Sequence, residues 1–175
     1  MLRQRIITGL ILAGALLATL AYAPHPLQAV LFALVAATGA WEWAGLVGAK
    51  TAAQRGGFAV VVPLLCFLLW QRIGLADQQP ATEAQPWLAV SAFFWSAMLL
   101  ALKYYPSGNW LLKLSWVRAV MGWLILSGTW LAVVVCLTFD NGSMVMLVMI
   151  LTVAAADIGA YFVGRRFGRH ALAKE

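Results

Sequence analysis

Residues 144–175 read MVMLVMILTVAAADIGAYFVGRRFGRHALAKE, an apolar run that contains one acid and then ends in cations. Within residues 144–163 Asp157 is the only charged side chain. An α-helix needs about 20 mostly apolar residues to cross the hydrocarbon core of a bilayer, and this run has that length. The stretch therefore predicts a membrane-spanning helix with polar and basic residues gathered toward its last turns.

The rest of the chain has the same character. Hydrophobic residues make up 63% and charged residues 10% of the 175 residues, and the mean hydropathy is +0.87. Soluble domains are roughly half apolar. We expect one all-α, polytopic membrane domain over residues 1–175, a helical bundle of about six transmembrane segments. These are 6–23, 27–47, 58–76, 87–102, 117–139 and 144–163.

Two of the six expected segments are weaker. Arg72 interrupts the segment 58–76, and 87–102 is shorter than a typical span. Both are compatible with a full crossing or with a re-entrant or interfacial helix.

Charge orients the expected helices, because cytoplasmic loops collect Lys and Arg. With both termini cytoplasmic, the outer side carries one cation, Arg72, beside the acids Asp77, Glu83 and Asp140. The inner side carries Arg3, Arg5, Lys50, Arg55, Lys103, Lys113, Arg118, Arg165, Arg166, Arg169 and Lys174. We expect a multi-pass membrane protein with both termini in the cytoplasm. The sequence Ala21-Tyr22-Ala23 resembles a signal-peptidase site, but we expect the first helix to be retained.

Several features predict packing between helices. Trp116, Trp123 and Trp130 recur every seven residues, which places them near one face of a helix and favours a packing or lipid-facing stripe over a ligand site. Ala36, Ala40 and Ala44 form a small-residue face that permits close approach of another helix. Cys66 and Cys136 are expected to be buried as small apolar residues.

Two acids, Glu42 and Asp157, lie inside the apolar segments, where a carboxylate needs a partner, water or a neutral state. Each precedes the next cation, Lys50 or Arg165, by eight residues, or about 12 Å along a helix. Both acids are therefore expected near the inner head groups. Trp41 and Trp43 flank Glu42, which favours an interfacial position for that carboxylate.

Asp157 is followed by several residues that suit ligand binding. On a helix, Tyr161, Gly164, Arg165 and Gly168 follow it along one face. This face suits a phosphorylated amphiphile or a nucleotide, because Arg grips phosphate oxygens and Gly leaves room for a ligand. The alternative is structural: Asp157 pairs with an Arg, and the cations Arg165, Arg166 and Arg169 only end the helix at the inner surface.

The same residues carry a family resemblance. The stretch AAADIGAYFVGRRFGRHAL resembles the D-x-G-A-Y-x-x-G-R-x-x-G segment of bacterial phosphatidate cytidylyltransferases, also called CDP-diacylglycerol synthases. The stretches LRQRIITGLIL and AWEWAGL resemble the corresponding earlier parts of that family.

The resemblance implies an integral membrane nucleotidyltransferase of phospholipid biosynthesis, located in a bacterial inner membrane. Such an enzyme condenses CTP with phosphatidic acid, forming CDP-diacylglycerol and pyrophosphate with the help of Mg²⁺. Carried over position by position, it implies substrate contact by Asp157, Tyr161, Gly164 and Arg165, to which we add Arg166 and Gly168. Asp157 is also a candidate metal ligand. No residue is assigned as a catalytic base.

The family pattern continues with further helices and a C-terminal signature that supplies metal carboxylates, and this signature does not occur in the 175 residues. We therefore expect the chain to be the N-terminal portion of a longer family fold, without the main catalytic centre and inactive in this form. The faces that later helices would cover predict a homodimer or an unstable chain.

Two other functions remain open. The first is a non-catalytic scaffold or anionic-lipid-binding subunit that uses the basic inner surface. The second is a small transporter, which is disfavoured because the expected spans lack ionisable residues near the midplane. A nucleic-acid partner is not expected, because no basic helix with interleaved exposed aromatics lies outside the spans.

Overall fold

The structure, a computed structural model, describes residues 2–73, 82–103 and 113–168. This part of the chain is helical apart from short turns. The helices are α1 (Leu2–Tyr22), α2 (His25–Val47), α3 (Ala52–Ile73), the 3-10 turn η2 (Thr82–Ala84), α4 (Gln85–Lys103), α5 (Ser115–Leu137) and α6 (Gly142–Phe167). The expected all-α membrane bundle is confirmed.

Each expected segment overlaps one helix, but the helix ends differ from the expected bounds. The largest difference is in α3, which begins at Ala52, ahead of the expected Phe58. Its start is fixed by side chains: the Gln54 amide oxygen accepts hydrogen bonds from the backbone N–H groups of Lys50 and Thr51, at 2.9 and 3.2 Å. Residues 74–76, the expected end of this segment, lie outside the described residues.

Among the described residues, four helices are long and apolar enough to cross a bilayer: α2, α3, α5 and α6. The apolar part of α1, Ile7–Tyr22, is shorter. Because a bilayer offers no water to unpaired backbone groups, such segments must satisfy their hydrogen bonds within helices. The chain is therefore an α-helical membrane protein.

Short turns connect three successive helix pairs. The turn after α2 uses Gly48 at φ 107°, a left-handed conformation that glycine adopts without steric cost. Between α1 and α2, the side-chain amide of Gln28 donates hydrogen bonds to the carbonyls of Thr19 and Ala23, at 3.1 and 3.0 Å. The α5–α6 turn is closed by the Gly142 N–H, which donates to the Phe139 carbonyl at 2.8 Å.

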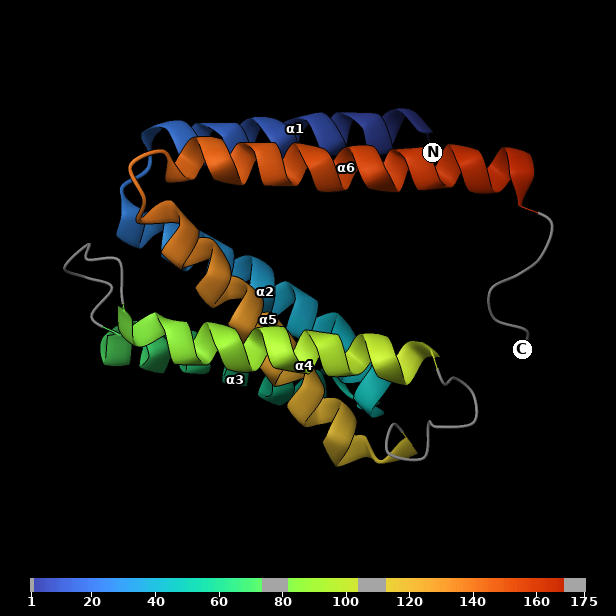
Figure 1. Ribbon diagram of the computed structural model, residues 1–175. Helices are drawn as coiled ribbons and strands as arrows, with labels where there is room; N and C mark the ends of the chain where they lie inside the picture. Colours follow the sequence, from blue (N-terminus) through green and yellow to red (C-terminus); the bar gives the residue numbers. More distant parts are fainter. Residues whose placement is uncertain (1, 74–81, 104–112, 169–175) are drawn as a thin grey trace.

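The core lies where α2, α3 and α5 pack together. Figure 1 shows α1 and α6 side by side, with α2 and α5 running obliquely from them toward α3 and α4. Ala40 and Ala44, from the expected small-residue face, are fully buried. Val62 of α3 and Leu131 of α5 are buried in the same core cluster as Ala40.

Three indole N–H groups join these core helices. Trp43 of α2 donates to the Arg118 carbonyl of α5 at 2.8 Å, and Trp130 of α5 donates to the Ala29 carbonyl of α2 at 2.9 Å. Trp123 donates to a third carbonyl, that of Phe58 on α3, at 3.4 Å, and its ring stacks on the Phe58 ring with centroids 5.1 Å apart. The tryptophan stripe thus packs at Trp123 and Trp130, whereas Trp116 is 65% exposed.

Candidate functional site

The candidate residues lie on the last turns of α6. Every side chain from Leu151 to Gly168 is exposed, in contrast to the buried Met146 near the start of the same helix. The described neighbours of α6 are chiefly α5 and α1, and Figure 1 shows the last turns of α6 extending past the start of α1. The candidate face is therefore open to a ligand or another helix.

The helix stays continuous through the whole motif. It ends at Phe167, and the Gly168 N–H donates to the Gly164 carbonyl at 2.9 Å. Arg165 and Arg166 lie in the last turn, where cations interact favourably with the negative end of the helix dipole. Because the helix is unbroken, Asp157, Tyr161 and Arg165 follow one another at one-turn intervals along one side.

Within this face the structure brings Tyr161 and Arg165 together. An Arg165 guanidinium N–H donates to the Tyr161 hydroxyl at 3.5 Å. Tyr161 also packs edge to face against Phe162, with ring centroids 5.5 Å apart. The hydroxyl thereby holds the guanidinium along the helix surface, on the same side as Asp157.

The expected alternative, an ion pair between Asp157 and an Arg, is not seen among the residues described in 2–73, 82–103 and 113–168. Arg169, one of the cations that could have formed it, lies outside these residues. Asp157 is exposed on the α6 surface. Its carboxylate is open to a cation or a polar ligand.

Gly164 and Gly168, the two glycines of the candidate face, have different roles. A side chain at Gly164 would meet nothing within 4 Å, so this position leaves free space beside Arg165. A Cβ at Gly168 would collide with the Gly164 carbonyl. The absence of a side chain at Gly168 therefore permits the close backbone approach at the end of the helix. Arg166 turns from the face, and its guanidinium lies 5.9 Å from the centre of the Phe167 ring.

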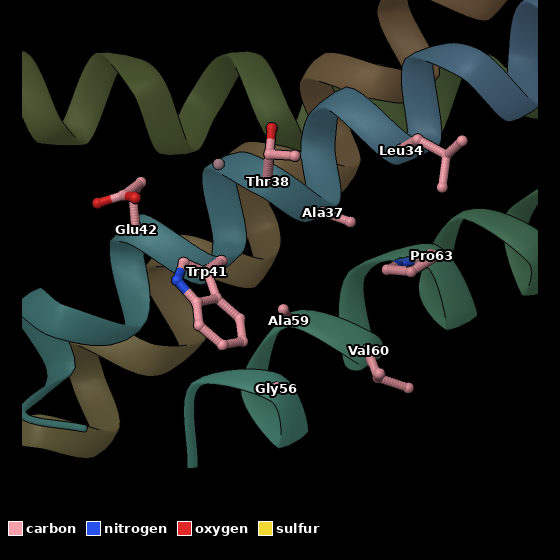
Figure 2. A pocket seen from close by; sticks show the side chains of 10 residues that line it. Leu34, Ala37, Thr38, Trp41, Glu42, Gly56, Ala59, Val60 and Pro63 are labelled. Carbon is pink, nitrogen blue, oxygen red and sulfur yellow. The ribbon is translucent and has the colours of Figure 1, made fainter. Parts of the chain in front are cut away.

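Glu42 belongs to a different place. It is exposed on α2 and lines a groove between α2 and α3, together with Thr38 and Trp41 (Figure 2). The interpretation of Trp43 as an interfacial neighbour of Glu42 misses its tertiary role, because Trp43 points to α5 and bonds the Arg118 carbonyl. The structure does not gather Glu42 with the α6 residues.

A metal site is not completed by the described residues, among which no three His, Cys, Asp or Glu side chains converge. On the α6 face, Asp157 offers an exposed carboxylate. Mg²⁺ is often held by one or two carboxylates, with substrate phosphates and water as the other ligands. Asp157 fits the role of a single protein ligand of that kind.

The groove beside Glu42 is the feature that the sequence interpretation missed. Its walls depend on how α2 and α3 pack, which hydropathy does not report. A local signal was present in Arg55-Gly56-Gly57 followed by Pro63, a cation and small residues at the start of an apolar helix.

The fold and the α6 face define a helical membrane protein with an exposed acid, phenol and guanidinium at one helix end. The model of the cytidylyltransferase family matches residues 3–175, and the chain belongs to this family. The curated phosphatidate cytidylyltransferase of Pseudomonas aeruginosa is 31% identical to it over 173 residues. That of Haemophilus influenzae is 28% identical over 184 residues.

Both alignments cover 99% of this chain, but 61% of the Pseudomonas protein and 64% of the Haemophilus protein. The chain thus spans less than two thirds of the length of these curated relatives. No solved structure matches it significantly.

Proposed function

We propose that this chain acts in phospholipid biosynthesis as a phosphatidate cytidylyltransferase, joining CTP and phosphatidic acid to give CDP-diacylglycerol and pyrophosphate. Membership of the cytidylyltransferase family and two relatives named phosphatidate cytidylyltransferase support the reaction. The open face of Asp157, Tyr161 and Arg165 on α6 is the structural observation that carries the proposal.

In this reaction an oxygen of the lipid phosphate forms a bond to the α-phosphorus of CTP. The bond from that phosphorus to the bridging oxygen breaks, and pyrophosphate leaves with the electron pair. The lipid phosphate is already anionic at neutral pH, so positioning and charge stabilisation suffice and no general base is assigned.

Each residue of the face has a part in this scheme. The Arg165 guanidinium binds phosphate oxygens in a bidentate fork, and Tyr161 keeps it oriented through the 3.5 Å hydrogen bond. Gly164 leaves space for the phosphate, and Arg166 and Gly168 adjoin it at the end of the helix. Asp157 is the proposed ligand of Mg²⁺, which when bound would offset the charge of the nucleotide phosphates.

The proposed location is a bacterial inner membrane, with both termini in the cytoplasm where CTP is found. The excess of Lys and Arg on one side of the expected helices supports this orientation. A homodimer is also proposed. The exposed apolar residues of α6, such as Leu151, Val153 and Phe162, support a further helix neighbour. Cross-linking in native membranes tests the dimer, and a product only of monomer size would contradict it.

The reaction is tested by CTP-dependent conversion of phosphatidic acid in vesicles, with binding of CTP and Mg²⁺ measured alongside. Asp157→Asn is expected to abolish conversion and to weaken Mg²⁺-dependent CTP binding, while helicity stays unchanged. Asp140→Asn is the matched control, because Asp140 is also exposed but lies in the turn before α6.

Two outcomes would contradict the proposed reaction. If the chain neither converts phosphatidic acid nor binds CTP, or if both acid variants behave alike, the proposal is wrong. The alternative scaffold function predicts binding of anionic lipid that CTP and Mg²⁺ do not alter.

A further inference from the structure

A groove runs between α2 and α3, away from the α6 face. It holds a cavity of about 720 Å³ lined largely by apolar side chains, among them Leu34, Trp41, Val60 and Pro63 (Figure 2). A second cavity of about 370 Å³ shares Leu34 and Pro63 and continues toward Trp70. Together the two cavities extend along most of the helix pair.

Gly56 and Pro63 are two α3 residues without a long side chain that line this groove. Gly56 has no side chain, and a Cβ placed there would come to 3.7 Å from the Trp41 ring. Pro63 lies inside α3 and has no N–H to donate to the Ala59 carbonyl one turn earlier. Leu34 and Val60 at the rim are 56% and 65% exposed, so the groove opens toward the lipid chains of the surrounding bilayer.

One end of the groove is cationic. Arg55 lies in the first turn of α3, and its guanidinium packs onto Gly45 of α2, with Nη2 3.3 Å from the place a Cβ would occupy. Gly45 follows Trp41 by one turn, and Gly56 adjoins Arg55, so the guanidinium lies where the groove meets the helix ends. Lys50, exposed in the α2–α3 turn, adds a second positive charge.

The Arg55 guanidinium stays accessible to a ligand, because none of its nitrogens is buried. Its side chain is half-buried, yet among residues 2–73, 82–103 and 113–168 it has no carboxylate or carbonyl acceptor. Glu42 lies at the rim, but Figure 2 shows its carboxylate turned away from the α3 side of the groove. A partly buried guanidinium without an acceptor favours an anionic ligand, and a phosphate offers matching paired oxygens.

We propose that this groove binds a glycerophospholipid with an anionic head group. The phosphate lies on Arg55 near Lys50, and an acyl chain lies along Trp41, Gly56 and Pro63. Basic pockets between membrane helices at the head-group level bind anionic lipids in this way. The site is independent of the proposed transferase reaction, since its residues lie on α2 and α3 and not on α6.

The test uses the full chain, purified in detergent and offered equal amounts of phosphatidylglycerol and phosphatidylcholine with the same acyl chains. Native mass spectrometry then counts the lipid molecules retained. Phosphatidylglycerol is chosen because it carries the anionic phosphate and is not the proposed substrate. We expect it to be retained over phosphatidylcholine, and Arg55→Gln to weaken its retention about fivefold.

Matched variants separate the site from general effects. Arg72→Gln removes an exposed cation from the other end of α3 and is expected to leave retention unchanged. Gly56→Leu fills the groove and is expected to reduce retention of both lipids. Gly57→Leu is its control, because a Cβ at Gly57 meets nothing within 4 Å.

Three results would overturn the proposal. The first is equal retention of phosphatidylglycerol by the wild type and the Arg55→Gln variant. The second is displacement of the lipid by excess glycerol phosphate, because the site would then bind a free phosphate. The third is selective retention that occurs only after Glu42→Gln, since Glu42 would then be the native partner of Arg55.

Discussion

Helices α5 and α6 have the same mean hydropathy, 2.1 in their most apolar stretches, but opposite surroundings. In that stretch 44% of the α5 residues are buried within the protein, against 6% in α6. Hydropathy reports that both helices belong in a bilayer, and it does not report what each one touches. The difference comes from small residues and hydrogen-bonding indoles, which α5 directs toward its neighbours.

Gly122 and Gly128 are the positions where α5 admits other helices. A Cβ at Gly122 would collide with the Trp43 indole, and one at Gly128 would come to 3.0 Å from the Ser91 Cβ of α4. Membrane helices gain their packing energy from such close approach, because lipid tails are as apolar as Leu. The glycines Gly159 and Gly164 of α6 face open space instead.

The largest expected effect comes from Gly122→Ala. The added methyl group displaces the Trp43 indole, whose Cε2 would lie 2.9 Å away, and disturbs its hydrogen bond to the Arg118 carbonyl. Overpacking of this kind costs about 1–3 kcal/mol, and we expect a lower thermal midpoint in detergent. A midpoint equal to or above that of the wild type would show that α2 and α5 are not packed as described.

A smaller loss is expected for Trp130→Phe, which removes the buried hydrogen bond to the Ala29 carbonyl. The net contribution of such a hydrogen bond in a membrane protein, together with the small loss of side-chain volume, predicts a decrease of about 1–2 kcal/mol in the free energy of unfolding. Trp116→Phe on the same helix is the control, because Trp116 is 65% exposed. Equal unfolding midpoints for the two variants would contradict the contrast between the inner and outer faces of α5.

The smallest effect, and one of opposite sign, is expected for Gly159→Ala. This is the same chemical change as Gly122→Ala, but the added methyl group meets nothing within 4 Å. Alanine favours a helix over glycine by about 0.5–1 kcal/mol, so the unfolding midpoint should rise slightly. A clear fall would show that a neighbour covers this part of α6.

Much of the fold was predictable because long apolar runs and their flanking charges depend on local sequence. Helix α3 begins at Ala52, ahead of the expected apolar span from Phe58, because the bonds between Gln54 and the backbone of Lys50 and Thr51 extend the helix beyond the apolar run. The Trp43 bond to Arg118 joins residues 75 positions apart, and no local pattern reveals it.

The α6 face was predictable for a similar reason. Asp157, Tyr161 and Arg165 share one side of one helix, so helical periodicity alone aligns them. Their roles remain predictions, because the residues that would complete a metal or nucleotide site must come from elsewhere in space. The groove between α2 and α3 was missed because its two walls, with Trp41 on α2 and Pro63 on α3, meet only in the packed bundle.

The indole bonds of the core also have an optical consequence. Trp123 and Trp130 are shielded within the bundle, whereas Trp87, Trp95 and Trp116 are 47%, 48% and 65% exposed to their surroundings. Brominated lipids quench indole fluorescence on contact. They should therefore quench the exposed indoles more strongly than the shielded ones. The emission that survives quenching is then a built-in optical signal of whether α2, α3 and α5 are assembled.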